Sequence, residues 1–472
     1  TNLLLWLFLI VPFFANGQHT IIKGVAPLSI GKEIQLRVKD DPITQKERVL
    51  ASQIVDVDGS FELKAVVNGT QYAFLQVGLD CADFFIERDK DLELSFVPPK
   101  QDPKKPRGFY ERNFFIPKTT GGTLESLNGE IVAFNDSIDQ FLEALYPLLV
   151  QRRSPKIVAM ELAGFEEKML KHFAKAEPFV QDYIAYSLAG VEQTFLTDRK
   201  RLFEKYLKGK KVQPTNPAFI DFVVQFYQGT VYNTLMVNRI DEVQKILKGQ
   251  EVFARLDEIL AEDQQLQNTF LRRLMLINSV KELIGHKSVD SKKLLVELKR
   301  FGGLMSNSYL AQAAKNMAKK HEKLAVGSMA PEISFYGIDG EAKQLSDLQG
   351  SYVFLELTDV SNTYCQRETN VIPNLKNEFR NIRFLTVCVG NSQEEVESIQ
   401  KKMGIDWDFG RVSIASSVIE DYDVKSLPLF FIINPKGEFY KVPAPDPTKG
   451  AQGELMSLNE LIKAKGRRGV GR

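Results

Sequence analysis

The sequence predicts a multidomain protein in which an N-terminal antiparallel β-sandwich, a central all-α region and a C-terminal α/β domain follow one another. Three patterns predict this order. Apolar residues alternate with polar ones before residue 99, recur every three or four positions between residues 123 and 322, and form strand-like runs between helical patterns from residue 324 to 465. A chain of 472 residues is also too long for one ordinary hydrophobic core.

The first element is a predicted signal peptide at residues 1–17. An uninterrupted apolar run from Leu3 to Phe14 is too short to cross a bilayer, and it ends in the small residues Ala15 and Gly17, which suit signal peptidase. No later stretch reaches membrane-spanning length without charges. We therefore expect an exported protein, periplasmic or envelope-associated after cleavage, with no integral membrane span.

Residues 18–99 are expected to form the β-sandwich. Apolar and polar side chains alternate at residues 60–66, and Asp58-Gly59 just before them is typical of a tight turn between strands. Residues 100–122 are rich in proline and charge, so we expect them to be an exposed linker.

Residues 123–322 are expected to be helical. A seam of apolar residues at alternating spacings of three and four opens this region: Leu124, Leu127, Ile131, Phe134, Ile138, Phe141 and Leu145. Two uses of the seam are open. Packing inside the chain's own bundle is favoured, and the alternative is a homodimer through the first five of these residues.

Residues 324–465 are expected to form the α/β domain, followed by a basic tail at residues 466–472. The markers come in a fixed order: Val-Gly-Ser-Met-Ala-Pro at 326–331, Leu-Ser-Asp-Leu-Gln-Gly at 345–350, an apolar strand at 352–357, and Leu427-Pro428 before a second apolar strand. Taken together, these markers resemble the thioredoxin superfamily, specifically the periplasmic branch of TlpA- and ResA-type thiol-disulfide proteins. Residues 55–61 likewise resemble the small β-domain that precedes such domains in some envelope proteins.

The resemblance implies a Cys-x-x-Cys pair directly after the first apolar strand. Counted without gaps from that strand, the first cysteine position falls on Asn362 and the second on Cys365. Glu356 then lies six residues before the first position, where the family often has a buried carboxylate. The rival register takes Cys365 as first and Glu368 as second and gives Pro373 the role of the family's helix-kink proline, but it requires an insertion, so the gapless register is favoured.

The choice between the two registers decides whether the site can perform dithiol exchange. The first cysteine acts as a nucleophile because the start of a helix stabilises its thiolate, and the second attacks only the mixed disulfide that the first has formed. An asparagine at the first position has no redox state, so the gapless register does not support dithiol exchange. The resemblance also implies that Pro428 is a cis proline and that the backbone at Leu427 and Pro428 lines a groove for extended peptides.

Cysteine and charge exclude several other classes of protein. Besides Cys365, only Cys81 and Cys388 are present, too few for a disulfide framework, and we expect both to be small buried side chains. The four histidines show no metal-ligand spacing, so no metal or other cofactor is expected. With 61 Lys and Arg against 60 Asp and Glu, the chain lacks the basic excess of a nucleic-acid-binding protein.

Three functional hypotheses remain. The leading one is an envelope protein with a degenerate thioredoxin-like site that binds a peptide or another protein. The second is a thiol-disulfide oxidoreductase or peroxidase-like enzyme that uses Cys365, with Glu356 as the other candidate catalytic residue. The third is a purely structural oligomer. An acidic, accessible thiol at Cys365 would favour the enzyme.

Overall fold

The computed structural model describes residues 19–41, 43–78, 80–99, 112–119, 126–150, 155–195, 198–284, 286, 288–413, 416–424 and 426–469. The predicted signal peptide and Leu124 therefore lie outside the described residues. The chain divides into two compact units: one holds residues 1–99 and 113–228, and the other holds residues 100–112 and 229–472.

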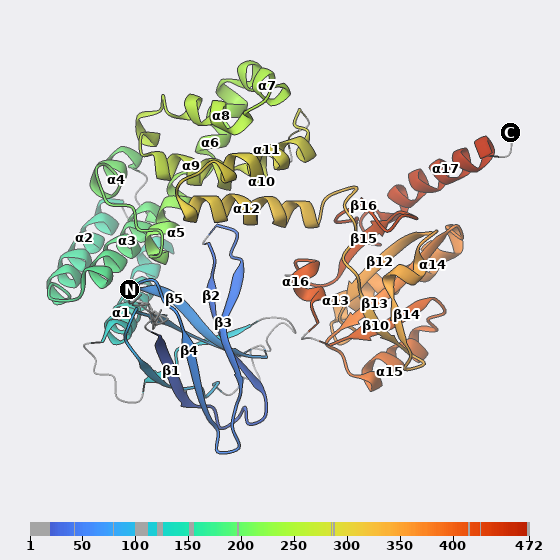
Figure 1. Ribbon diagram of the computed structural model, residues 1–472, viewed down its shortest axis with the longest axis horizontal. Coiled ribbons are helices and arrows are strands. Elements are labelled where there is room, and N and C mark those ends of the chain that lie inside the picture. The colour runs from blue at the N-terminus through green and yellow to red at the C-terminus, as the bar shows by residue number, and fades with distance from the viewer. Residues whose placement is uncertain are drawn as a thin grey trace, which may run out of the picture. The chain divides into compact units, whose positions relative to one another are not determined.

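The first unit begins with two β-sheets, whose strand orders are β4-β1-β7-β9 and β3-β2-β5-β6-β8 (Figure 1). The strands are β1 (Thr20–Val25), β2 (Glu33–Lys39), β3 (Glu47–Ile54), β4 (Ser60–Ala65), β5 (Gln71–Val77), β6 (Asp80–Ile86), β7 (Leu92–Ser95), β8 (Asn113–Phe115) and β9 (Lys118–Thr119). Their alternating apolar side chains fill one core, which includes Ile22 and Leu63 from the first sheet and Leu36 and Leu75 from the second.

Two features of these sheets differ from the sequence prediction. Strand β7 lies parallel to β1, and β8 lies parallel to β6, so the sheets are mixed and the antiparallel sandwich is not confirmed. Strands β8 and β9 also fall inside the range predicted as a linker. Aromatic contacts hold β8 against the sheets. Phe115 packs on Phe96 of the core, and Phe114 packs on Phe74.

In its described residues, the first unit continues with the helices α1 (Leu127–Val150), α2 (Pro155–His172), α3 (Pro178–Phe195), α4 (Arg199–Tyr206) and α5 (Pro217–Phe226). The predicted apolar seam lies on α1. Leu127, Ile131 and Phe134 are buried in one cluster with residues of α2 and α3 and with Phe85 of β6, and Ile138 packs against that cluster. The seam is thus covered within its own chain, as the favoured interpretation expects, and a homodimer through these buried residues is not supported.

The second unit contains a series of short helices that pack against one another (Figure 1). They are α6 (Thr230–Tyr232), the π-helix η1 (Asn233–Asn238), α7 (Ile240–Lys248), α8 (Val252–Leu260), the 3-10 helix η2 (Gln264–Leu266), α9 (Thr269–Asn278), α10 (Val280–Ile284), α11 (Ser291–Gly303) and α12 (Ser308–Lys323). Asn268, Asp290 and Asn307 cap the starts of α9, α11 and α12 with their side chains, which satisfies N–H groups that have no partner inside the helix.

A seven-stranded sheet of order β11-β10-β14-β13-β12-β15-β16 forms the rest of this unit. Its elements are β10 (Ser334–Gly337), β11 (Ala342–Gln344), the 3-10 helix η3 (Leu345–Leu348), β12 (Tyr352–Thr358), α13 (Thr363–Thr369), α14 (Ile372–Glu378), β13 (Ile382–Val389), α15 (Gln393–Met403), β14 (Asp408–Val412), α16 (Val418–Asp421), β15 (Leu429–Ile433), β16 (Phe439–Lys441) and α17 (Ala451–Gly469). Strands β12, β13 and β14 run parallel, and β15 runs antiparallel to β12.

Apolar cores cover both faces of this sheet. Leu355, Leu357 and Leu385 belong to the core on one face, and Phe354 and Phe384 belong to the core that α14 and α17 cover on the other. Because β12 is central and buried on both faces, its residues are almost all apolar, as expected of a parallel strand. Glu356 interrupts that pattern, so it marks the position of the candidate site.

Candidate functional site

The site forms where the chain leaves β12 and enters α13. Asn362 is the N-cap of α13: its side-chain Oδ1 accepts the backbone N–H groups of Tyr364 at 2.8 Å and Cys365 at 3.4 Å. Asn362 is exposed, and no partner of its side-chain Nδ2 is found in the described part of the chain. The amide can therefore donate hydrogen bonds outward, but it offers no nucleophile.

Cys365 lies one turn further along α13 and faces the sheet. Its side chain is fully buried, and burial raises the pKa of its thiol to about 11. At neutral pH such a group is a thiol rather than a thiolate, so it is a poor nucleophile. Cys388 of β13 and Cys81 of β6 are also buried and unbridged, in agreement with their prediction as small buried side chains.

Glu356 lies beneath α13 and is fully buried. Its two carboxyl oxygens accept hydrogen bonds from Thr369 Oγ1 of α13 at 2.7 Å and from Thr386 Oγ1 of β13 at 2.8 Å. Trp407 Nε1 donates to the same Thr386 hydroxyl at 3.0 Å. Burial raises the pKa of Glu356 to about 7, because the two hydroxyl donors only partly replace the lost water.

Glu368 of α13 is a second buried carboxylate. It accepts the backbone N–H of Thr448 at 2.9 Å and the hydroxyl of Thr448 at 2.6 Å, and it thereby fastens α13 to the loop before α17. The sequence did not reveal this contact, because 80 residues separate the two partners.

Leu427 and Pro428 lie at the same end of the sheet as Asn362. Leu429 pairs with Leu357 near the end of β12, so the two residues before Leu429 lie beside the start of the β12–α13 turn. The Leu427–Pro428 peptide bond is cis, and both side chains are half-buried. The structure therefore brings the predicted site residues 356, 362, 365, 427 and 428 to one corner of the domain.

A polar turn that sequence reasoning missed supports this corner. Asp359 is buried. It accepts hydrogen bonds from the backbone N–H of Ser361 at 2.9 Å and from the Asn391 side chain at 2.9 Å. Asn391 in turn accepts the N–H of Val360 at 3.2 Å. The Asp-x-Ser spacing of this turn is the local signal that indicates it. Among the residues that the structure describes, no group of three or more His, Cys, Asp or Glu is placed to hold a metal ion.

The strand order, the helix that follows β12 and the turn before β15 define a thioredoxin-like domain. Residues 326–442 match the AhpC/TSA family. The chain is 30% identical over 139 residues to the thiol-disulfide oxidoreductase ResA of Bacillus subtilis (strain 168), a match that covers 29% of this chain and 77% of that protein. It is 27% identical over 129 residues to the protein of the same name from Geobacillus kaustophilus (strain HTA426), over 27% and 74% of the two chains.

Through its C-terminal domain, the chain therefore belongs to the family of ResA-like thiol-disulfide oxidoreductases. Among solved structures, the thioredoxin domain of a thiol-disulfide oxidoreductase from Bacteroides vulgatus is 19% identical, with a TM-score of 0.27 over 29% of this chain and 98% of that one. The family assignment rests on the sequence relatives and on the topology. Across the described ranges, no helix combines the length and apolarity that a bilayer crossing requires.

Proposed function

We propose that this chain is an exported protein of the cell envelope whose thioredoxin-like domain binds an extended peptide or a partner protein and performs no dithiol exchange. In this proposal Asn362 occupies the first position of the family's cysteine pair, and Cys365 occupies the second. The observation that carries it is the contrast in exposure: the residue at the start of α13 is an exposed asparagine, and the remaining thiol is fully buried.

The burial of the site residues favours the gapless register over its rival. A pair needs an exposed first cysteine at the start of the helix and a second one a turn deeper. Asn362 and Cys365 fit these two environments. The rival register would place the nucleophile on the buried Cys365, whose pKa is raised to about 11, and the second position on Glu368, which is already bonded to Thr448.

Peptide binding is supported by what the corner offers. Leu427 and Pro428 are half-buried at its edge, and in the family that this sequence resembles the backbone at this proline pairs with extended peptides. The outward amide of Asn362 would donate a hydrogen bond to a peptide carbonyl where active relatives form a mixed disulfide.

The alternative function is a thiol-disulfide oxidoreductase or peroxidase-like enzyme that uses Cys365. The names of the relatives favour it, since both are thiol-disulfide oxidoreductases. The buried thiol argues against it, because neither a peroxide nor a disulfide can reach a sulfur that is 0% exposed without opening α13.

Insulin reduction and dithiol oxidation by the purified full chain separate the two functions. We expect no turnover from the wild type, and Asn362→Cys should form a reversible disulfide with Cys365, detected by mass spectrometry. Glu368→Cys is the matched control, because it restores a pair only in the rival register. Wild-type turnover that Cys365→Ser abolishes would contradict the proposal that the domain performs no dithiol exchange.

The domain plan belongs to the same proposal: a signal peptide at residues 1–17, a β-sandwich at 18–99, a helical domain at 123–322 and an independently folding domain at 324–465. The length and small-residue end of the apolar run support the signal peptide. N-terminal sequencing of the protein from fractionated cells tests export, and circular dichroism of a fragment that starts near residue 323 tests the domain boundary.

A further inference from the structure

Tyr364 is an aromatic residue held in a fixed orientation at the rim of the proposed site. It lies between Asn362 and Cys365 on the first turn of α13, and it is 39% exposed. Its hydroxyl donates to Asp446 Oδ2 at 3.1 Å and accepts from Lys449 Nζ at 2.8 Å. Because its own chain engages the hydroxyl, the part of Tyr364 left to contact a ligand is its apolar ring.

The loop that holds Tyr364 is itself fixed. Asp446 and Lys449 form an ion pair at 3.1 Å, and the Lys449 ammonium lies 5.3 Å from the centre of the Tyr364 ring. Thr448, between them, bonds the buried Glu368 through both its N–H and its hydroxyl. The ring is therefore ordered before any ligand arrives, which lowers the entropy lost on binding.

The surroundings of the ring define the chemistry of its ligand. Ser361, Asn362 and Thr363, which precede it, are exposed and uncharged, and the charge of Lys449 is balanced by Asp446. Two different elements contribute apolar groups to this corner: α13 carries the Tyr364 ring, and the segment before β15 carries Leu427 and Pro428. This pattern suits a peptide backbone that bonds to the polar segment and places an apolar side chain on the ring.

We infer that Tyr364 determines the specificity of the site by receiving an apolar side chain of an extended peptide segment. The inference rests on the proposed peptide-binding function and adds the residue and the ligand chemistry to it. Tyrosine is one of the residue types that are enriched among the strongest contributors to binding at protein interfaces.

The test uses the full-length protein and a thiol-blocked unfolded chain, reduced and carbamidomethylated α-lactalbumin, with affinity measured by fluorescence anisotropy. Tyr364→Ala should weaken binding about tenfold. Tyr364→Phe keeps the ring but loses both hydroxyl contacts, so it should weaken binding less than Tyr364→Ala does. Tyr336→Ala is the matched control, since this tyrosine of β10 is 55% exposed in the same domain, and it should leave the affinity unchanged.

The possible outcomes distinguish a failure of the inference about Tyr364 from a failure of the proposed peptide-binding function. If Tyr364→Ala, shown to be folded by circular dichroism, binds the probe as the wild type does, the inference is overturned and the peptide site stands. If the wild type does not bind the probe, the proposed peptide-binding function fails and takes the inference with it. Should Tyr364→Ala not fold, Tyr364→Gln replaces it, with the same weakening expected.

Discussion

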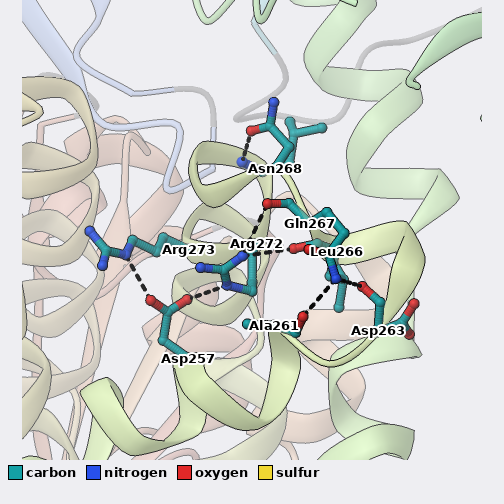
Figure 2. A network of polar contacts seen from close by, with 9 residues as sticks. Asp257, Ala261, Asp263, Leu266, Gln267, Asn268, Arg272 and Arg273 are labelled. Atoms are coloured by element: carbon teal, nitrogen blue, oxygen red, sulfur yellow. Dashed lines mark hydrogen bonds and ion pairs between the residues drawn. The ribbon is translucent and has the colours of Figure 1, made fainter. Parts of the chain in front are cut away.

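Two buried carboxylates in the second unit have opposite surroundings. Asp257 of α8 is 6% exposed and bonds two arginines of α9, Arg272 through Nε at 2.7 Å and Arg273 through Nε at 2.9 Å (Figure 2). Arg272 also donates to the backbone carbonyls of Leu266 and Gln267. Glu356 of β12 is 0% exposed and accepts hydrogen bonds from the hydroxyls of Thr369 and Thr386.

The difference separates a structural ion pair from a group that can exchange a proton. Two guanidinium groups balance the charge of Asp257, so this contact holds α8 and the turn after it to α9. The hydroxyls that bond Glu356 carry no charge, and burial raises its pKa to about 7. Near neutral pH, the carboxyl beneath α13 is therefore partly protonated, and the stability of this corner depends on pH.

The largest effect is expected when the charge of Asp257 is removed. Asp257→Asn keeps the shape of the side chain but leaves the buried Arg272 without its counter-ion. The free energy of unfolding of the helical region should therefore fall by about 3 to 5 kcal/mol. Urea unfolding measures the loss. Glu262→Gln is the control, because it breaks the exposed pair with Arg239, which water and salt screen, and it should change the stability far less than Asp257→Asn does. Equal losses from the two variants would contradict the comparison.

Glu356→Gln should remove a pH dependence. The folded protein binds the Glu356 proton more tightly than the unfolded chain does, because the pKa rises from 4.5 to about 7 on folding. The stabilisation is full below pH 4.5 and is lost as the pH rises to about 7, a change of about 3 kcal/mol. Unfolding at pH 5 and pH 8 should therefore show a smaller difference for the variant than for the wild type. The same difference in both proteins would mean that Glu356 does not titrate in this range.

The thiol of Cys365 should react slowly in the folded protein. Burial raises its pKa from 9.0 to about 11, so the thiolate fraction at pH 8 falls about a hundredfold, and access is blocked as well. Alkylation by iodoacetamide, mapped by mass spectrometry, should thus be at least about a hundredfold slower than in the guanidinium-unfolded chain. Cys388, also fully buried, serves as an internal control. Native-state labelling of Cys365 alone at the unfolded rate would revive the enzyme hypothesis.

The sequence predicts those parts of the molecule that depend on local patterns. Period-two alternation predicts the strands, and the spacing of Leu127, Ile131 and Phe134 predicts the buried face of α1. The pairing of distant segments has no local signal. The parallel placement of β7 beside β1, and of β8 beside β6, joins residues far apart in the chain, so neither followed from alternation.

The buried carboxylates likewise include one whose position the sequence predicts and others whose contacts it does not predict. Glu356 interrupts an apolar strand, so its burial beneath α13 could be expected from its position and from the family resemblance. The contact of Glu368 with Thr448 and that of Asp257 with Arg272 depend on tertiary placement. A sequence without an alignment gives no reason to pair these residues rather than leave each charge in solvent.

The smallest effect concerns Asn362, whose present role in the fold is to cap α13. Its Oδ1 accepts two backbone N–H groups, which would otherwise be left without a helical partner. Asn362→Ala should therefore cost about 1 kcal/mol, and Asn362→Ser, which keeps an acceptor at this position, should cost only a fraction of that. Thermal unfolding of the full chain, followed through the transition of the C-terminal domain, measures both. A loss as large from Ser as from Ala would show that the cap is not what Asn362 contributes. The expected result would show that the side chain of Asn362 stabilises the start of α13 as its N-cap, in addition to any role that it has in binding.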